Sequence, residues 1–449
     1  MYPWHESFSS WAKGTGLRID ALGLVTLLGA EEMDRNIGRL MPSDYFDYLP
    51  LLGAFVVAGD RFTDKKTGFI LYNISAGILT TELAGWVSRW VRAQDLYKVR
   101  SKVTWEVADR PFRWTKFFFG FILISLPLHG MLLALTVLSA DWWGFANVVS
   151  MILSVVVRCG QVHQNQAGID ANIEMAEKEA QAKMTKYEGA LQQFEDWQRT
   201  GPSTETRNPP SEPKDFHDAK VLMVTEDSNI LTLVAPNYLV KAVFTTSPRI
   251  PNPLFYLTCR AIGWAAFAVH VISIGMAELP IQICSVVLII VATVLTAYKV
   301  GSGDSKIWKA LRNRFARGNE EDESLTCWVT SRLKATISSY SEEWSVWTEE
   351  EREVSCYQDA NLQKGSLNKT GNKQKTFIDI ESLPTTRKRE PIQERRQDLY
   401  AWLDLTEEQD KCLVAWGLIP HNNDWQNAYQ EKKTFHRQRE IRRKAQGTE

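Results

Sequence analysis

KFFFGFILISLPLHGMLLALTVLSADWWGFANVVSMILSVVVR, residues 116–158, consists of two apolar runs separated by one aspartate and two tryptophans. A helix of about 20 apolar residues crosses the hydrocarbon layer of a membrane. The first run, residues 117–140, is long enough, and the second, residues 142–157, is shorter but begins with tryptophans that favour the membrane interface. We therefore expect residues 117–157 to form a transmembrane helical hairpin.

A second pair of apolar runs, at residues 261–277 and 279–298, predicts a second hairpin. The linkers inside the two pairs, SAD and AELP, contain no lysine or arginine, whereas residues 89–116 carry eight basic and three acidic side chains. Because basic loops stay on the cytosolic side, both hairpin tips are expected to be extracytosolic. The long loop of residues 158–260 and the C-terminus are then cytosolic.

Two further apolar stretches precede the first hairpin. Residues 68–88 are long enough to span, and Gly77, Thr81 and Gly85 form a ridge of small side chains suited to close helix packing in lipid. Residues 48–59 are too short to span alone. If both stretches cross, the protein has six membrane helices and a cytosolic N-terminus. If only the longer one crosses, it has five, and the N-terminus lies outside.

The long loop contains an amphipathic helix followed by a small β unit. Apolar side chains recur every three or four residues, which predicts a helix, at Ile169, Ile173, Ala176, Ala180, Met184, Tyr187, Leu191 and Phe194. Packing of this helix on the protein's own tail is favoured over pairing as a coiled coil. Residues 219–246 then read as three short strands separated by turns.

The tail after the second hairpin is polar and rich in tryptophan. A basic amphipathic segment follows the last membrane helix and is expected to lie on the anionic lipid surface, through Lys306, Lys309, Arg312, Arg314 and Arg317. Apolar spacing over residues 325–347 predicts another helix, and residues 358–390 are expected to be disordered. Near the end, Thr406 begins a TEEQ capping box and Gly417 is placed to end that helix.

Three segments resemble multi-pass membrane proteins of filamentous fungi. They are VVRCGQVHQNQAGID at residues 156–170, SPRIPNPLFYLTCRAIGWAAFAVHVISIGM at residues 247–276, and DLYAWLDLTEEQDKCLVAWGLIPH at residues 398–421. The resemblance extends over residues 116–420 and is most specific in the second hairpin. It implies a membrane location and a cytosolic tail, and it implies no activity and no functional residues.

Motifs for catalysis, cofactors or metals are not found in the sequence. It contains no phosphate-binding glycine loop, no HExxH and no GxSxG, and its six cysteines have no paired spacing. Cys159 and His163 lie one helical turn apart, but two ligands do not make a metal site. The net charge of −1 gives no general attraction to nucleic acid. We therefore expect no cofactor, no metal and no nucleic-acid partner, and nothing indicates an enzyme.

Polar residues inside the apolar segments are the candidate functional residues. His129 and His270 are placed near the membrane midplane, Asn147 lies on the extracytosolic half, and Glu82 lies in the possible segment 68–88. An ionisable residue at this depth suggests a function by default. Here we favour a structural role, in which these side chains form hydrogen bonds that hold neighbouring helices together. A proton relay or solute path through facing histidines is the alternative.

The sequence as a whole predicts a mainly α, polytopic membrane protein with two helical hairpins, one or two N-terminal membrane segments, a small cytosolic β unit and a helical C-terminal tail. Its expected parts are an N-terminal region (1–47), possible membrane segments (48–88), a basic cytosolic loop (89–116), the first hairpin (117–157), a cytosolic loop (158–260), the second hairpin (261–298), basic and tryptophan-rich helices (299–357), a disordered linker (358–390) and a basic helical tail (391–449).

This organisation favours a membrane-anchored interaction or scaffold protein. The lipid bilayer is its expected partner, together with a cytosolic protein bound through the amphipathic helices. A small transporter or channel that uses the midplane histidines is the alternative.

Overall fold

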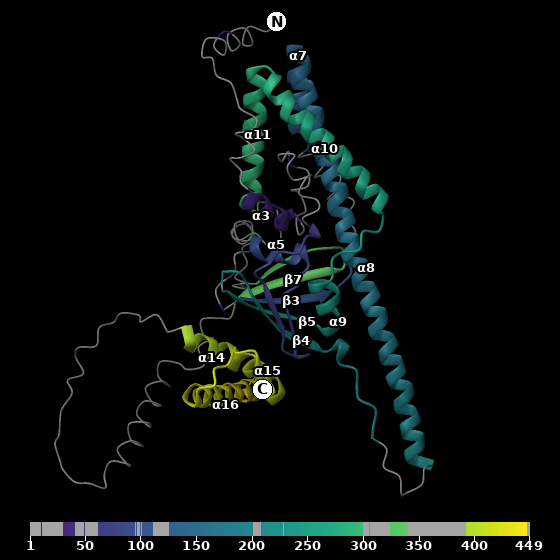
Figure 1. Ribbon diagram of the computed structural model, residues 1–449, viewed down its shortest axis with the longest axis vertical. Helices are drawn as coiled ribbons and strands as arrows, with labels where there is room; N and C mark the ends of the chain where they lie inside the picture. Colours follow the sequence, from purple (N-terminus) through teal and green to yellow (C-terminus); the bar gives the residue numbers. More distant parts are fainter. Residues whose placement is uncertain are drawn as a thin grey trace, which may run out of the picture. The chain divides into compact units, whose positions relative to one another are not determined.

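The computed structural model describes residues 30–40, 62–94, 101–110, 125–200, 208–227, 229–299, 324–339 and 392–446, with residues 10, 49, 96, 99 and 305 as single positions. The chain divides into two compact units, one formed by Met1–Leu96 and Lys102–Ser338 and the other by Tyr97–Ser101 and Ser339–Glu449. In the described residues, the first unit contains the apolar helices and a β-sheet, and the second contains three helices (Figure 1).

Seven strands from distant parts of the sequence form a single sheet in the order β2-β1-β4-β5-β3-β7-β6. The strands are β1 (Ile70–Asn73), β2 (Ile78–Thr80), β3 (Ser101–Val107), β4 (Asp218–Val224), β5 (Ile230–Pro236), β6 (Leu325–Trp328) and β7 (Leu333–Ser339). Antiparallel pairs join β1 to β2, β1 to β4, β4 to β5 and β6 to β7. The small β unit expected from the sequence is therefore only the centre of a larger sheet.

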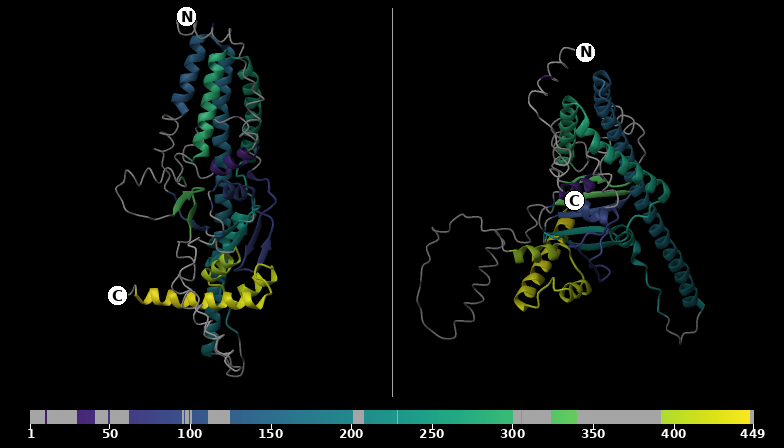
Figure 2. Two further views of the ribbon diagram at one scale, coloured as in Figure 1. Left: turned by 90° about the vertical axis from the view of Figure 1, so that its left-hand side faces the viewer. Right: turned by 45° about the horizontal axis from the view of Figure 1, so that its top comes forward.

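Four apolar helices form a bundle above the sheet (Figures 1 and 2). They are α7 (Leu126–Ser139), α8 (Trp142–Thr200), α10 (Pro253–Met276) and α11 (Leu279–Ala297). Three of the described helices, α8, α10 and α11, are long and apolar enough to cross a membrane. The described part of α7 is shorter, and residues 117–124 lie outside the described residues.

The aspartate between the two apolar runs joins the tips of the two hairpins. Asp141 Oδ2 accepts a hydrogen bond of 2.7 Å from the backbone N–H of Glu278, and Oδ1 accepts one of 2.9 Å from Gly144. Gly144 leaves no room for a larger side chain, because a Cβ there would lie 2.8 Å from Ile281. The two tips are therefore held together by a carboxylate that caps α8 and reaches the start of α11.

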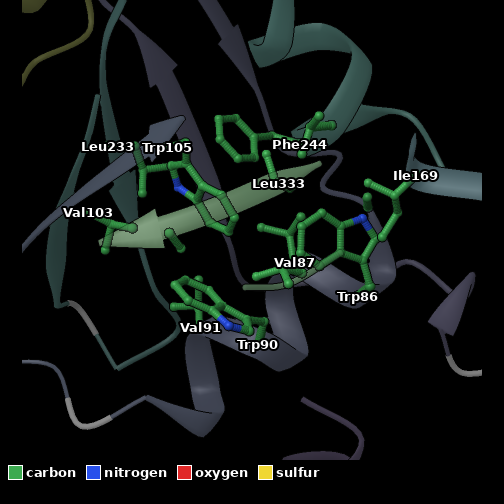
Figure 3. Close-up of a cluster of buried hydrophobic side chains, with 14 of the residues drawn as sticks. Trp86, Val87, Trp90, Val91, Val103, Trp105, Ile169, Leu233, Phe244 and Leu333 are labelled. Atoms are coloured by element: carbon green, nitrogen blue, oxygen red, sulfur yellow. The ribbon is translucent and has the colours of Figure 1, made fainter. Parts of the chain in front are cut away.

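One hydrophobic core is shared by the sheet and the helices around it. In α5 (Gly85–Ala93), Trp86 and Trp90 pack on Trp105 of β3, with ring centroids 6.1 Å and 4.9 Å apart. Phe244 contacts Trp105 from the other side, at 5.4 Å (Figure 3). Ile169 of α8 belongs to the same cluster. Because α8 also forms the bundle, the bundle and the sheet are parts of one packed body.

Four shorter elements complete the described part of the first unit. They are α3 (Ala30–Leu40), the 3₁₀ turn η4 (Lys214–Phe216), α9 (Asn237–Leu239) and the π-helical turn η5 (Val240–Thr245). Leu239, Val243 and Phe244 are buried in the shared core. Residues 237–245 thus pack as helical turns, although the sequence predicts a third strand there.

The prediction that residues 68–88 form a membrane helix is wrong. These residues form the β1–β2 hairpin and the first turn of α5. Asn73 Oδ1 accepts a bond from the Ala76 N–H at 3.1 Å, and Gly77 adopts a positive φ of 67°. A polar side chain that closes the turn and a left-handed glycine favour the hairpin. The shorter stretch, residues 48–59, lies outside the described residues apart from Leu49.

The helix predicted over residues 325–347 is also wrong where the chain is described. Residues 325–339 form β6 and β7, joined by a turn in which Thr330 Oγ1 accepts from the Leu333 N–H at 2.9 Å. Cys327, Leu333 and Ala335 point into the shared core. Burial on one face of the sheet therefore explains the spacing of these apolar residues. The rest of the predicted helix, from residue 340 on, lies outside the described residues, as does the chain up to residue 391.

The second unit packs α14 (Ile392–Trp402), α15 (Glu407–Ala415) and α16 (Asn423–Gln446). The predicted capping box is confirmed, since Thr406 and Gln409 exchange side-chain bonds with each other's backbone. Gly417 has a φ of 69°, and the N–H of Leu418 reaches the carbonyl of Leu413 at 2.9 Å. These bonds close the end of α15 as a left-handed cap does.

Candidate functional site

The long helix α8 is attached to the sheet by polar contacts to the β6–β7 turn. Asp170 accepts bonds from the hydroxyls of Thr330 and Ser331, the latter at 2.6 Å. Glu177 pairs with Arg332 at 2.8 Å. The amphipathic helix expected from the sequence is thus a continuation of the second helix of the first apolar hairpin, and it packs against the protein's own chain.

On its other side, α8 is attached to the segment that leads into α10. Asn172 donates to the carbonyls of Ala242 and Ser247, at 3.4 and 3.2 Å. A Cβ on Gly168 would lie 2.5 Å from the carbonyl oxygen of Arg249, so only glycine permits this approach. These contacts fix the position of α8 relative to η5.

A groove of about 760 Å³ lies between these elements. One wall is the β1–β2 hairpin, and the other is α8 from Asn172 to Lys183. The floor includes α9 and the π-helical turn η5. We call this the sheet groove. π-helical turns are rare and occur frequently at functional sites.

The sheet groove combines exposed apolar side chains with a rim of mixed charge. Ile78 of β2 is 56% exposed and Met175 of α8 is 38% exposed. The lining residues include three acidic and three basic side chains, and two of these, Lys183 and Asp215, pair at 3.0 Å. This chemistry suits a polypeptide or a small amphipathic ligand more than a phosphate-rich one, which would need a concentration of positive charge.

Glu82, expected inside a membrane segment, is an exposed residue at the edge of the sheet groove. Its carboxylate forms a close ion pair with Lys65, and this hydrogen bond lowers the pKa of Glu82 below its usual value. Glu82 follows β2 and precedes α5. The intramembrane position expected for Glu82 is therefore wrong. The lipid-surface candidates Lys306, Lys309, Arg312, Arg314 and Arg317 lie outside the described residues.

His129 is buried in α7 and forms its hydrogen bond within its own helix. Nδ1 donates to the carbonyl oxygen of Ser125 at 2.9 Å, and the Ser125 hydroxyl lies 3.2 Å from the same nitrogen. Because a carbonyl only accepts, Nδ1 carries the proton that forms this bond. Nε2 has no partner among the described residues.

His270 and Asn147 lie where α8, α10 and α11 meet. The ring of His270, which is 4% exposed, lies against the backbone of Asn147. The Asn147 side chain donates to the hydroxyl of Ser285 on α11 at 3.0 Å. His129 and His270 thus have different neighbours, and the structure brings His270 and Asn147 together.

Replacing Ser285 with alanine should loosen the bundle, because the Asn147 amide would lose its partner on α11. We expect a loss of about 0.6–2 kcal/mol in unfolding free energy, the usual range for a hydrogen bond between membrane helices. Titration of the protein in mixed micelles with SDS, followed by circular dichroism, measures this change. Thr258→Ala is the matched control, since within the described part of the chain the Thr258 hydroxyl bonds only to the carbonyl of Leu254, in its own helix. Equal losses in the two variants would contradict an interhelical role for Asn147.

Two groups of residues in this region were not found by reading the sequence. The first is the sheet groove, whose walls come from residues 71–82, 172–183 and 237–249. The second is a buried polar stripe along α8, formed by Asn147, Ser150, Ser154, Arg158, Gln161 and Asn165. Its spacing of three and four residues is visible in the sequence. Comparison with protein-family models, curated proteins and solved structures finds no match.

Proposed function

We propose that the protein is a membrane-anchored binding protein whose sheet groove receives an extended polypeptide segment at the cytosolic surface. The two hairpins cross the bilayer with their tips outside, and the sheet lies on the cytosolic side. The absence of basic residues from SAD and AELP, against eight in residues 89–116, supports this orientation. The hydropathy and length of α8, α10 and α11 support the crossing.

The edge of the sheet supports an extended polypeptide as the ligand. In the strand order, β2 is the outermost strand beside the sheet groove. A strand at the edge of a sheet presents unpaired backbone groups, and peptides bind such edges by adding a strand. Ile78 and Thr80 line the sheet groove on one face of β2. An added strand would place alternate side chains against these residues.

The single observation that carries the proposal is the core shared by α8 and the sheet. Ile169 and Ile173 of α8 are buried in the same cluster as Leu231 and Leu233 of β5. The same helix supplies one wall of the sheet groove and one member of the apolar bundle. A ligand in the sheet groove is therefore held at a fixed distance from the membrane segments, as an anchoring function requires.

Ile78→Lys should weaken binding of an extended peptide by about tenfold or more, equivalent to about 1.4 kcal/mol. A charged side chain would replace an apolar contact on the groove face of β2. The probe is a fluorescent eight-residue peptide of alternating valine and threonine, added to the full-length protein in lipid nanodiscs. Fluorescence polarisation measures its dissociation constant.

Leu79→Lys is the matched control. Leu79 is 47% exposed on the same strand but is not part of the groove lining. Its substitution should leave peptide binding unchanged. If both substitutions weakened peptide binding equally, the peptide would be binding to exposed apolar surface in general. That result would contradict the sheet groove as the binding site. No binding by the unmodified protein at millimolar peptide would contradict the proposal itself.

A small transporter is the second candidate, and the polar stripe on α8 favours it. The pairing of two midplane histidines is not what supports it, because His129 bonds to Ser125 and His270 lies against Asn147. The support comes from the buried polar residues Asn147, Ser150 and Ser154, which lie in the apolar part of α8.

A further inference from the structure

The charged side chains that line the sheet groove are not all paired. Two ion pairs account for half of them, Lys183 with Asp215 and Glu82 with Lys65. The other charges of the lining are exposed and form no ion pair within the described part of the chain; they are Lys241, Arg249 and Glu179. The unpaired charges are therefore two cations and one carboxylate.

The contacts of the β1–β2 hairpin identify the two ends of the sheet groove. At one end, the turn before β2 lies against β4, where the N–H of Lys220 donates to Ser75 Oγ at 2.9 Å. At the other end, shortly after β2, the N–H of Ala84 donates to the carbonyl of Phe244 at 2.8 Å. The strand β2 therefore runs toward the residues of η5, and we call this the η5 end.

Lys241 and Arg249 lie together at the η5 end. The Asn172 amide bonds to the carbonyls of Ala242 and Ser247, which neighbour these two residues in the chain. Arg249 Nη1 also donates to the sulfur of Met175, at 3.7 Å. The guanidinium is thus held against the α8 wall of the sheet groove.

In the proposed orientation, this pair of cations lies beyond the headgroups of the bilayer. Met175 lies about 25 Å along α8 from Arg158, where the apolar run ends, at about 1.5 Å per residue. The headgroup layer is only about 5–8 Å deep on each side. Figure 1 shows α8 continuing past the apolar bundle and beside the sheet. A ligand in the sheet groove is therefore a better placed partner for these charges than a lipid headgroup.

We infer that the polypeptide bound in the sheet groove has acidic side chains at the end that lies beside Lys241 and Arg249. The inference rests on the proposed function and adds the chemistry of the ligand. Carboxylates form charge-assisted hydrogen bonds with lysine and arginine. Glu179 lies one helical turn beyond Met175, away from the η5 end, and repels a carboxylate placed there. Charge complementarity therefore also fixes the register of the bound chain.

Three fluorescent eight-residue peptides with neutral, capped ends test the inference. One alternates valine and threonine, and the others have two aspartates in place of its first two or its last two residues, because an added strand can run in either direction. Fluorescence polarisation measures their binding to the full-length protein in phosphatidylcholine nanodiscs. We expect at least one acidic peptide to bind about tenfold tighter than the neutral peptide, as charge-assisted bonds allow.

The double variant Lys241→Gln, Arg249→Gln should remove this advantage and leave the affinity for the neutral peptide unchanged. The matched control is the double variant Lys178→Gln, Lys186→Gln. It removes the same charge from exposed positions of α8 outside the lining, and it should keep the advantage.

The possible results separate this inference from the proposed function. If all three peptides bound equally well, the inference would be overturned and the sheet groove would still be a peptide site. If none bound, both would be overturned. An advantage that survived in the Lys241, Arg249 double variant would also overturn the inference. Equal peptide binding, together with loss of retained phosphatidylserine in that variant by native mass spectrometry, would assign the two cations to a lipid headgroup instead.

Discussion

Replacing Trp105 with alanine is expected to destabilise the sheet and the helices packed on it by about 3–5 kcal/mol, the usual cost of removing a large buried aromatic side chain. Trp105 is 1% exposed and contacts Trp86, Trp90 and Phe244. Its removal leaves a cavity where α5, β3 and η5 meet. Denaturant unfolding of the full-length protein in detergent, followed by near-ultraviolet circular dichroism, measures the loss.

Phe216→Ala is the control for Trp105. Phe216 is 41% exposed, and its ring lies 5.6 Å from that of Tyr238. We expect its truncation to cost about 1 kcal/mol or less, as for a substitution that leaves no buried cavity. If Trp105→Ala cost no more than this, the tryptophan cluster could not be the centre of the shared core. If the sheet lost stability and the apolar bundle did not, the conclusion that bundle and sheet share one core would also be contradicted.

The second large effect is expected in the C-terminal unit, at the buried ion pair of Asp398 and Lys432. The two side chains are 1% and 10% exposed, and Lys432 Nζ lies 2.7 Å from Asp398 Oδ1. Asp398→Asn leaves the lysine charge buried without its counter-charge. Such a change typically costs about 3–5 kcal/mol. Hydrogen exchange of α14 and α16 in the full-length protein measures the free energy of opening.

An exposed ion pair in the same unit provides the control for Asp398. Arg437 and Asp404 pair at 2.6 Å with side chains about half exposed. Arg437→Ala should change opening by about 1 kcal/mol or less, because solvent screens such pairs. Combining Asp398→Leu with Lys432→Met should recover much of the stability, since neither charge then remains buried. No recovery in the double variant would mean that Asp398 acts through other contacts.

Segments governed by local signals were predictable from the sequence. Helices α10 and α11 follow from long apolar runs, and the cap of α15 follows from Thr406 and Gln409, three residues apart. Strands β4 and β5 follow from two apolar runs around a polar turn. In each case the interacting groups are close together in the chain, so the pattern contains the whole interaction.

Residues 68–88 show where local reasoning fails. Their apolar and small side chains fit a membrane helix, but Ile70–Asn73 pair instead with Val221–Val224 of β4. The pairing partner is about 150 residues away in the sequence, beyond any periodic pattern. Within the segment itself, Asn73 and Glu82 argue against a membrane helix, since such a helix rarely contains two residues of this kind. Residues 325–339 were misread for the same reason, because β7 and β6 complete a sheet that begins at residue 70.

The apolar hairpins, their expected orientation and the cap of α15 could be predicted from the sequence, because hydrophobic length, charge asymmetry and capping are properties of short segments. The junction of the bundle with a seven-stranded sheet through α8 could not. Nor could the groove between residues 71–82 and 172–183, or the burial in one line of the polar residues from Asn147 to Asn165. These features depend on contacts between segments far apart in the chain, and the free energy that selects them comes from packing the whole core.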